Sequence, residues 1–119
     1  MRKGREMSNR TRIVTDEDME KALDWLRDNA KEIGDAKAEV IRASHMLKVV
    51  KALTMKMFNE KPVSVQEREA LCSEKYQEAL ERDAVAAGEY EKMRALREAA
   101  ALKIEAWRSE QANYRALRI

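Results

Sequence analysis

The sequence predicts an all-α protein built as a long antiparallel helical hairpin. Charged residues make up 39% of the 119 residues and aromatic residues 5%, with 3 glycines and 1 proline. This usage is typical of long helices and coiled coils, whereas a sheet protein would carry more turn-forming and β-branched residues. Apolar residues recur at steps of three and four along two segments that Pro62 separates. At this length the chain forms one domain at most.

The first helix is expected over residues 15–59. Thr15 and Asp18 form an acidic variant of the capping box, and the acidic residues that follow suit the positive end of the helix dipole. Between Ile33 and Ala36 the apolar repeat slips by one residue beside Gly34, so one bent helix or two collinear helices would satisfy it. The expected seam consists of Met19, Leu23, Leu26, Ala30, Ile33, Ala36, Val40, Ala43, Leu47, Val50, Leu53 and Met57.

A turn is expected at residues 60–63 and a second helix over residues 64–118. Pro62 cannot occupy a helix interior, and Ser64 with Glu67 would form the capping box of the new helix. Polar residues recur at one of the two core positions, a pattern that fixes register or oligomeric state in coiled coils. The expected seam consists of Cys72, Tyr76, Ala79, Asp83, Ala86, Tyr90, Met93, Arg97, Ala100, Ile104, Trp107, Gln111 and Tyr114.

The charge distribution favours antiparallel pairing of the two helices. Residues 15–35 carry eight acids and three bases, and residues 92–119 carry seven bases and three acids. Residues 36–60 carry five bases and two acids, and residues 61–91 carry four bases and eight acids. Folding back at Pro62 sets each acidic quarter against a basic one, so the charges specify orientation more than they add stability.

A two-helix hairpin is expected to dimerise. Its core would be thin, and the second helix carries a further stripe of small residues: Ala84, Ala87, Ala95, Ala99 and Ala106. Pairing of two chains into a four-helix bundle would cover that stripe. The candidate residues for an oligomer or partner interface are Trp25, Tyr76, Tyr90, Met93, Ile104, Trp107 and Tyr114.

Catalysis is not expected. His45 is the only histidine, which excludes a histidine-based relay with a second histidine or a multi-histidine metal site. Cys72 lies in the expected seam, where a small buried thiol is common. The sequence contains no Gly-rich phosphate loop or metal-ligand cluster. We therefore expect no enzyme activity, no cofactor and no bound metal.

Nucleic-acid binding is the alternative function. Residues 1–14 form a basic arm, and the end of the second helix combines basic and aromatic residues that could contact phosphates and bases. Against this, the net charge is only +2 and acids of the first helix share that end of the hairpin. The candidate contact residues are Arg2, Lys3, Arg5, Arg10, Arg12, Arg108, Arg115 and Arg118.

The cytoplasm is the expected compartment, and no membrane association is expected. A single cysteine excludes an intrachain disulfide and predicts a reducing compartment. The basic start precedes the acidic run TDEDMEK rather than an apolar segment, so it does not resemble a secretory signal. Mixed-sign surfaces also argue against binding to a membrane surface.

The stretch from Arg68 to Arg115 carries a set of residues on one long expected helix: Tyr76, Tyr90, Leu96, Arg97, Ile104, Trp107, Arg108 and Asn113. Through these residues it resembles short uncharacterised helical proteins of phages and prophages. The resemblance covers somewhat under half of the chain, and it implies a small accessory factor that binds DNA or host proteins. We therefore expect a non-enzymatic interaction or adaptor protein that self-associates and binds another macromolecule through its helix faces or tips.

Overall fold

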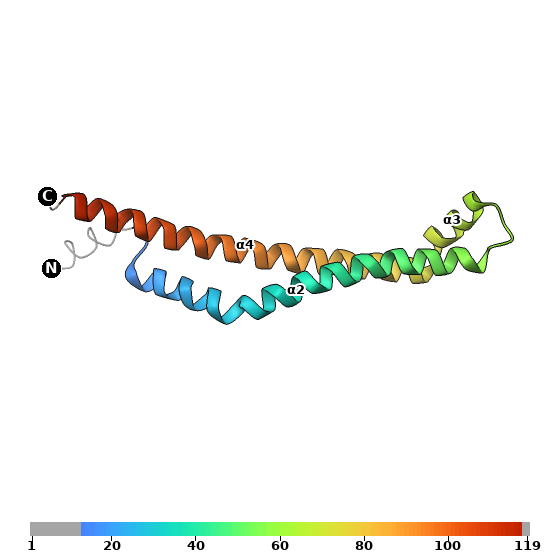
Figure 1. The fold of residues 1–119 in the computed structure, drawn as a ribbon, viewed down its shortest axis with the longest axis horizontal. Coiled ribbons are helices and arrows are strands. Elements are labelled where there is room, and N and C mark those ends of the chain that lie inside the picture. The colour runs from blue at the N-terminus through green and yellow to red at the C-terminus, as the bar shows by residue number, and fades with distance from the viewer. Residues whose placement is uncertain (1–12, 118–119) are drawn as a thin grey trace. The chain divides into compact units, whose positions relative to one another are not determined.

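The computed structural model describes residues 13–117 and contains helices and loops there, without strands. The elements follow the order α2 (Asp16–Met57), α3 (Val63–Cys72) and α4 (Glu74–Leu117), as Figure 1 shows. The prediction of an all-α fold is therefore confirmed. Within the described range, none of these helices is long and apolar enough to span a bilayer.

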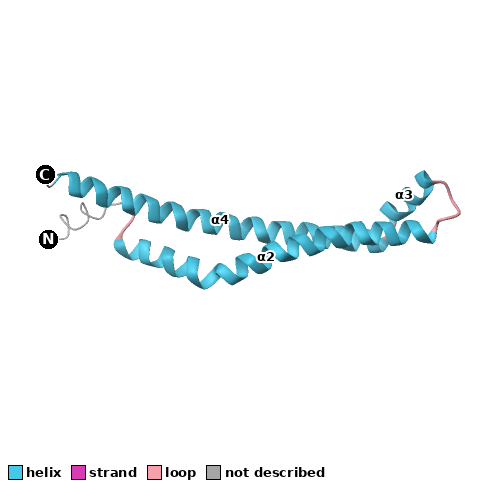
Figure 2. Cartoon of the chain, viewed as in Figure 1, coloured by secondary structure: helices cyan, strands magenta, loops and turns pink. Residues whose placement is uncertain are grey.

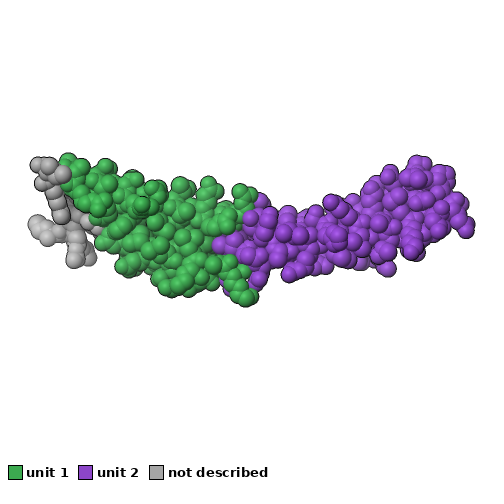
Figure 3. All heavy atoms as spheres, viewed as in Figure 1, with its two compact units in different colours: residues 1–31, 94–119 green, residues 32–93 purple. Residues whose placement is uncertain are grey.

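The chain divides into two compact units (Figure 3). Unit 1 consists of Met1–Lys31 and Arg94–Ile119, and unit 2 of Glu32–Met93. Within unit 1, Asp16 at the start of α2 contacts Trp107 near the end of α4, whereas Trp25 shares a hollow with Leu96. Residue numbers rise along α2 as they fall along α4, so the two segments are antiparallel.

Unit 2 pairs its helices in the same sense. Lys37 of α2 lies over the ring of Tyr90 in α4, whereas Met46, further along α2, shares a hollow with Ala79. The antiparallel pairing that a fold-back at Pro62 requires is thus present in each unit.

The core face of α2 follows an uninterrupted heptad repeat, and the predicted phase slip is wrong. Asn29 is half-buried and Thr54 buried on this face. Each is accommodated there because its side chain donates a hydrogen bond to the carbonyl four residues earlier, at 2.9 and 2.8 Å. With these two polar residues included, the repeat runs through Ala22, Leu26, Asn29, Ile33, Ala36, Val40, Ala43, Leu47, Val50 and Thr54, all buried or half-buried.

Four residues that were expected in the seam of α2 are exposed instead: Leu23, Ala30, Leu53 and Met57. The prediction placed only apolar residues in the seam, so it chose Ala30 in place of its neighbour Asn29 and Leu53 in place of Thr54. The helix is continuous through Gly34, whose missing Cβ would meet no atom within 4 Å. Gly34 therefore costs about 1 kcal/mol relative to alanine without creating a break.

The seam of α4 matches the prediction in its apolar column from Ala79 to Trp107, whereas Tyr114, expected in the same column, is exposed. Ala86, Met93 and Ala100, spaced seven residues apart, are all buried. The polar column lies at the edge of the pair: Asp83 and Gln111 are half-buried, and Arg97 is exposed. Among the described residues, no large side chain is fully buried, so the core consists mainly of alanines.

The predicted second helix is wrong in one respect, because it is broken at Ser73. This residue has an extended conformation (φ −70°, ψ 147°), and its backbone N–H donates to the Ala70 carbonyl. Its hydroxyl donates to the same carbonyl at 2.7 Å and accepts from the Tyr76 N–H at 3.2 Å. Ser73 therefore ends α3 and begins α4.

The break at Ser73 also changes which side of α3 is buried. One extended residue rotates the following helix relative to the preceding one, so the heptad phase of α4 does not continue into α3. Ala70 is fully buried, whereas Cys72, expected in the seam, is exposed. The prediction of a buried thiol is therefore wrong.

The first turn of α3 is held by Pro62 rather than by the predicted capping box of Ser64 and Glu67. The helix begins at Val63, and its cap position lacks a side-chain hydrogen bond. The N–H groups of Val65 and Gln66 instead donate to the Pro62 carbonyl, each at 3.0 Å. The loop between α2 and α3 (Figure 2) thus ends at Pro62, whose ring fixes φ near the helical value.

Ser73→Ala should destabilise the protein by about 1 kcal/mol, because it removes a hydroxyl that caps both α3 and α4. Urea unfolding followed by circular dichroism measures the loss. Ser64→Ala is the matched control, since Ser64 has no capping hydrogen bond, and it should change stability by less than about 0.5 kcal/mol. Equal losses in the two variants would contradict the assignment of Ser73 as the cap.

Candidate interaction surfaces

The start of α2 is held against α4 in unit 1 by hydrogen bonds to two carboxylates. The indole N–H of Trp107 donates to Asp16 at 2.7 Å. The Glu110 carboxylate accepts from the backbone N–H of Ile13 at 2.7 Å and of Val14 at 3.4 Å. These contacts, which we call the N-terminal clasp, fix the chain just before the helix, and Val14 is buried there.

The capping box predicted from Thr15 and Asp18 is confirmed. The Thr15 N–H donates to the Asp18 carboxylate, and the Asp18 N–H donates to the Thr15 hydroxyl, each at 3.1 Å. These two hydrogen bonds from Thr15 lower the pKa of Asp18 below its ordinary value, with Lys103 and Lys21 adding smaller effects. Because the pKa is lowered, the cap is complete at neutral pH and is lost only in acid.

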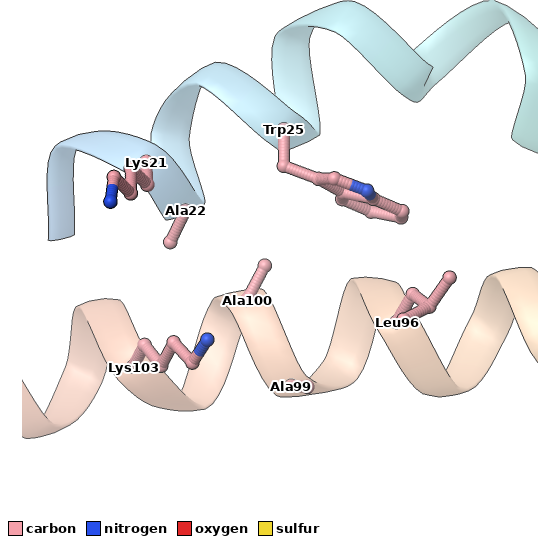
Figure 4. Close-up of a pocket in the computed structure, with 7 residues that line it drawn as sticks. All are labelled: Lys21, Ala22, Trp25, Leu96, Ala99, Ala100 and Lys103. Atoms are coloured by element: carbon pink, nitrogen blue, oxygen red, sulfur yellow. The ribbon is translucent and has the colours of Figure 1, made fainter. Parts of the chain in front are cut away.

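Trp25 lies at the edge of an open hollow in unit 1, of about 230 Å³. Figure 4 shows Ala22 and Ala100 pointing toward each other, with the Trp25 ring reaching toward Leu96. The Trp25 ring is half-buried and Leu96 is 42% exposed, so both present apolar surface at the edge of the helix pair. The full lining consists of Lys21, Ala22, Trp25, Leu96, Ala99, Ala100 and Lys103.

A second hollow in unit 1 brings Arg108 and Arg115 together beside Trp107 and Gln111. Arg108 pairs at 3.7 Å with the exposed Glu105, a contact that costs little to break. The other candidate nucleic-acid contacts, Arg2, Lys3, Arg5, Arg10, Arg12 and Arg118, lie outside the described residues.

The residues predicted to form an oligomer or partner interface differ in how much of each side chain is exposed. Met93 is 8% exposed, so the seam of α4 already buries it and little of it remains for a partner. Trp25, Tyr76, Tyr90, Ile104 and Trp107 are half-buried, and Tyr114 is 37% exposed.

Cross-helix polar contacts in unit 2 lie on opposite sides of the seam. The Arg82 guanidinium makes an ion pair with Glu39 at 2.8 Å on one side. On the other side, the Lys37 ammonium lies 5.0 Å from the centroid of the Tyr90 ring, a cation–π contact. Each contact joins α2 to α4 at an exposed edge.

The residues considered for chemistry are dispersed. Cys72 lines an open hollow beside Met57 and Phe58, and His45 is exposed on α2. Within residues 13–117, no three His, Cys, Asp or Glu side chains are grouped so that they could hold a metal ion.

The chain matches no protein-family model, and comparisons with curated proteins and with solved structures also give no match. Function is therefore inferred from the surfaces themselves.

Sequence reasoning did not identify the cross-helix contacts of Asp16 and Glu110 or the cap that Ser73 provides. Ser73 carried a recognisable signal, since a serine followed by Glu74 is a common helix start. The pairing of Asp16 with Trp107 and the contact of Glu110 with the backbone carried no local signal, because they join residues more than ninety positions apart.

Glu110→Ala should destabilise the protein by about 1 kcal/mol, because it removes the acceptor for two backbone N–H groups. Amide exchange of Ile13 and Val14 should accelerate most. Glu105→Ala is the matched control: this glutamate lies on the same helix and makes only an exposed ion pair, so the change should stay within a few tenths of a kcal/mol. Unchanged exchange at Val14 in the Glu110 variant would contradict the clasp.

Proposed function

We propose that the protein is a non-enzymatic helical interaction protein that self-associates and binds another macromolecule through its helix faces or tips. Pairing of two chains, so that four helices pack together, is the simplest form of self-association. The resemblance of residues 68–115 to helical phage proteins and the reducing compartment predicted from the single cysteine support an accessory role in the cytoplasm.

One observation carries this proposal: the helix pair leaves large apolar side chains in water while it buries mostly alanines. Exposed apolar residues lie on both edges of the pair, and a fully buried side chain of this size contributes roughly 1.5–3 kcal/mol. Several of them together would drive association. They are Leu23, Ile41, Met46, Leu53, Leu80, Val85, Leu96 and Leu102.

We expect the mass measured by light scattering to rise with protein concentration above that of one chain. The midpoint of thermal unfolding should rise with concentration as well, because association stabilises the folded state by mass action. A mass that stays at one chain over the whole concentration range, with a constant midpoint, would refute self-association.

Nucleic-acid binding is a second candidate, favoured by the hollow that gathers Arg108 and Arg115 beside Trp107. Arginines bind phosphates, and an aromatic ring at the same place can stack on a base. The indole N–H of Trp107 is already bonded to Asp16, so the ring would act through its face alone.

For this candidate, the double variant Arg108→Ala with Arg115→Ala should weaken binding to single-stranded DNA. The slope of log K against the logarithm of the salt concentration should become shallower, by the equivalent of roughly two phosphate contacts. A fluorescence titration at several salt concentrations measures both effects. Arg42→Ala with Arg68→Ala, in unit 2, is the control and should leave the slope unchanged. Deletion of residues 1–12 tests the basic arm while it keeps the N-terminal clasp. Absence of binding at low salt would exclude the candidate.

A further inference from the structure

One edge of unit 2 is basic and apolar. Lys37, Ile41, Lys48 and Lys51 follow the helical repeat along one side of α2. The contact of Lys37 with Tyr90 places this side of α2 next to the side of α4 that carries Leu80. We call this surface the lysine flank: Lys37, Ile41, Lys48, Lys51 and Leu80.

The opposite edge of unit 2 is acidic and apolar. An open hollow there is centred on Val85, which is 62% exposed, and four glutamates line it. Arg82 lies among them and is paired with Glu39. We call this surface the glutamate flank: Glu39, Glu78, Glu81, Arg82, Val85 and Glu89.

Most charges of the two flanks are not neutralised within the helix pair, the exception being Glu39, which pairs with Arg82 and Arg42. Glu78, Glu81 and Glu89 are exposed and form no ion pair within residues 13–117, and the same holds for Lys48. Lys51 is half-buried and forms no ion pair there either. The acids that α4 contributes near the lysine flank are Asp83, half-buried in the seam, and Glu91. Among the described residues, unit 2 therefore presents lysines without an ion-pair partner on one side and glutamates without one on the other.

We propose that a second copy of this chain docks its glutamate flank on the lysine flank of the first. The two surfaces are opposite in charge, and each has an exposed apolar side chain at its centre, Ile41 (60% exposed) on one and Val85 on the other. Docking would bury both side chains and surround them with lysine–glutamate pairs. This inference rests on the proposed self-association and specifies the surfaces that meet.

The contact joins two different surfaces, so it is heterologous rather than two-fold symmetric. After two copies have docked, one chain still presents a free lysine flank and the other a free glutamate flank. Further copies can add in the same way, and the assembly grows until a ring closes or a filament forms. High salt weakens the contact because it screens the lysine–glutamate pairs.

Charge reversal tests the proposal on the full-length chain. Lys48→Glu with Lys51→Glu makes both flanks acidic, and Glu78→Lys with Glu81→Lys makes both basic. Each variant alone should self-associate at least about tenfold more weakly than the natural chain, because like charges now meet. An equimolar mixture of the two variants should recover association, since each restores the missing charge for the other. Analytical ultracentrifugation measures all three samples.

Lys56→Glu with Lys92→Glu is the matched control, because it changes two exposed lysines of unit 2 outside the lysine flank. It should associate at least as well as the natural chain, and circular dichroism should show natural helicity in all variants. Recovery in the mixture supports the proposal. A closed dimer that both reversals leave unchanged would overturn it while self-association itself stands. A natural chain that remains monomeric would overturn both.

Discussion

The structure depends on a narrow seam in which α2 and α4 pack through small side chains. Ala22, Ala43, Ala86 and Ala100 are buried there, and Ala22 and Ala100 face each other in unit 1 (Figure 4). A seam of this kind buries little apolar area per residue, so each helix keeps larger apolar side chains at its edges. The thin core and the exposed apolar edges thus have the same cause, and both favour association with further helices.

Polar side chains set the limits and the register of this seam. Asn29 and Thr54 can occupy core positions because each bonds to its own helix backbone, which satisfies a polar group that would otherwise be costly to bury. Ser73 serves two helices at once and changes the heptad phase where they meet. The N-terminal clasp uses Asp16 and Glu110 to hold the beginning of α2, and it engages Trp107 within the chain.

The charges favour the antiparallel orientation of the two helices, yet many of the charged side chains form no ion pair within the helix pair. In unit 2 the basic side chains of α2 and the acidic side chains of α4 lie mostly on opposite edges, and the cross-helix ion pair of Glu39 and Arg82 lies on the acidic edge. The acidic and basic quarters of the two helices can therefore also favour contacts between chains. Surfaces of opposite charge that do not neutralise each other within one chain can do so between two chains.

The sequence by itself determined the helical class, the antiparallel sense in each unit, the capping box of Thr15 and Asp18, and the apolar column of Ala86, Met93 and Ala100. These features follow from composition, net charge and local spacing, which act over a few residues or over whole segments. Only the tertiary structure decided that Asn29 and Thr54 belong to the core, that Ser73 divides the second helix, and that Cys72 is exposed. The physical reason is that heptad phase is set by which residues meet across the pair, and a polar side chain that bonds to its own backbone can be accommodated there.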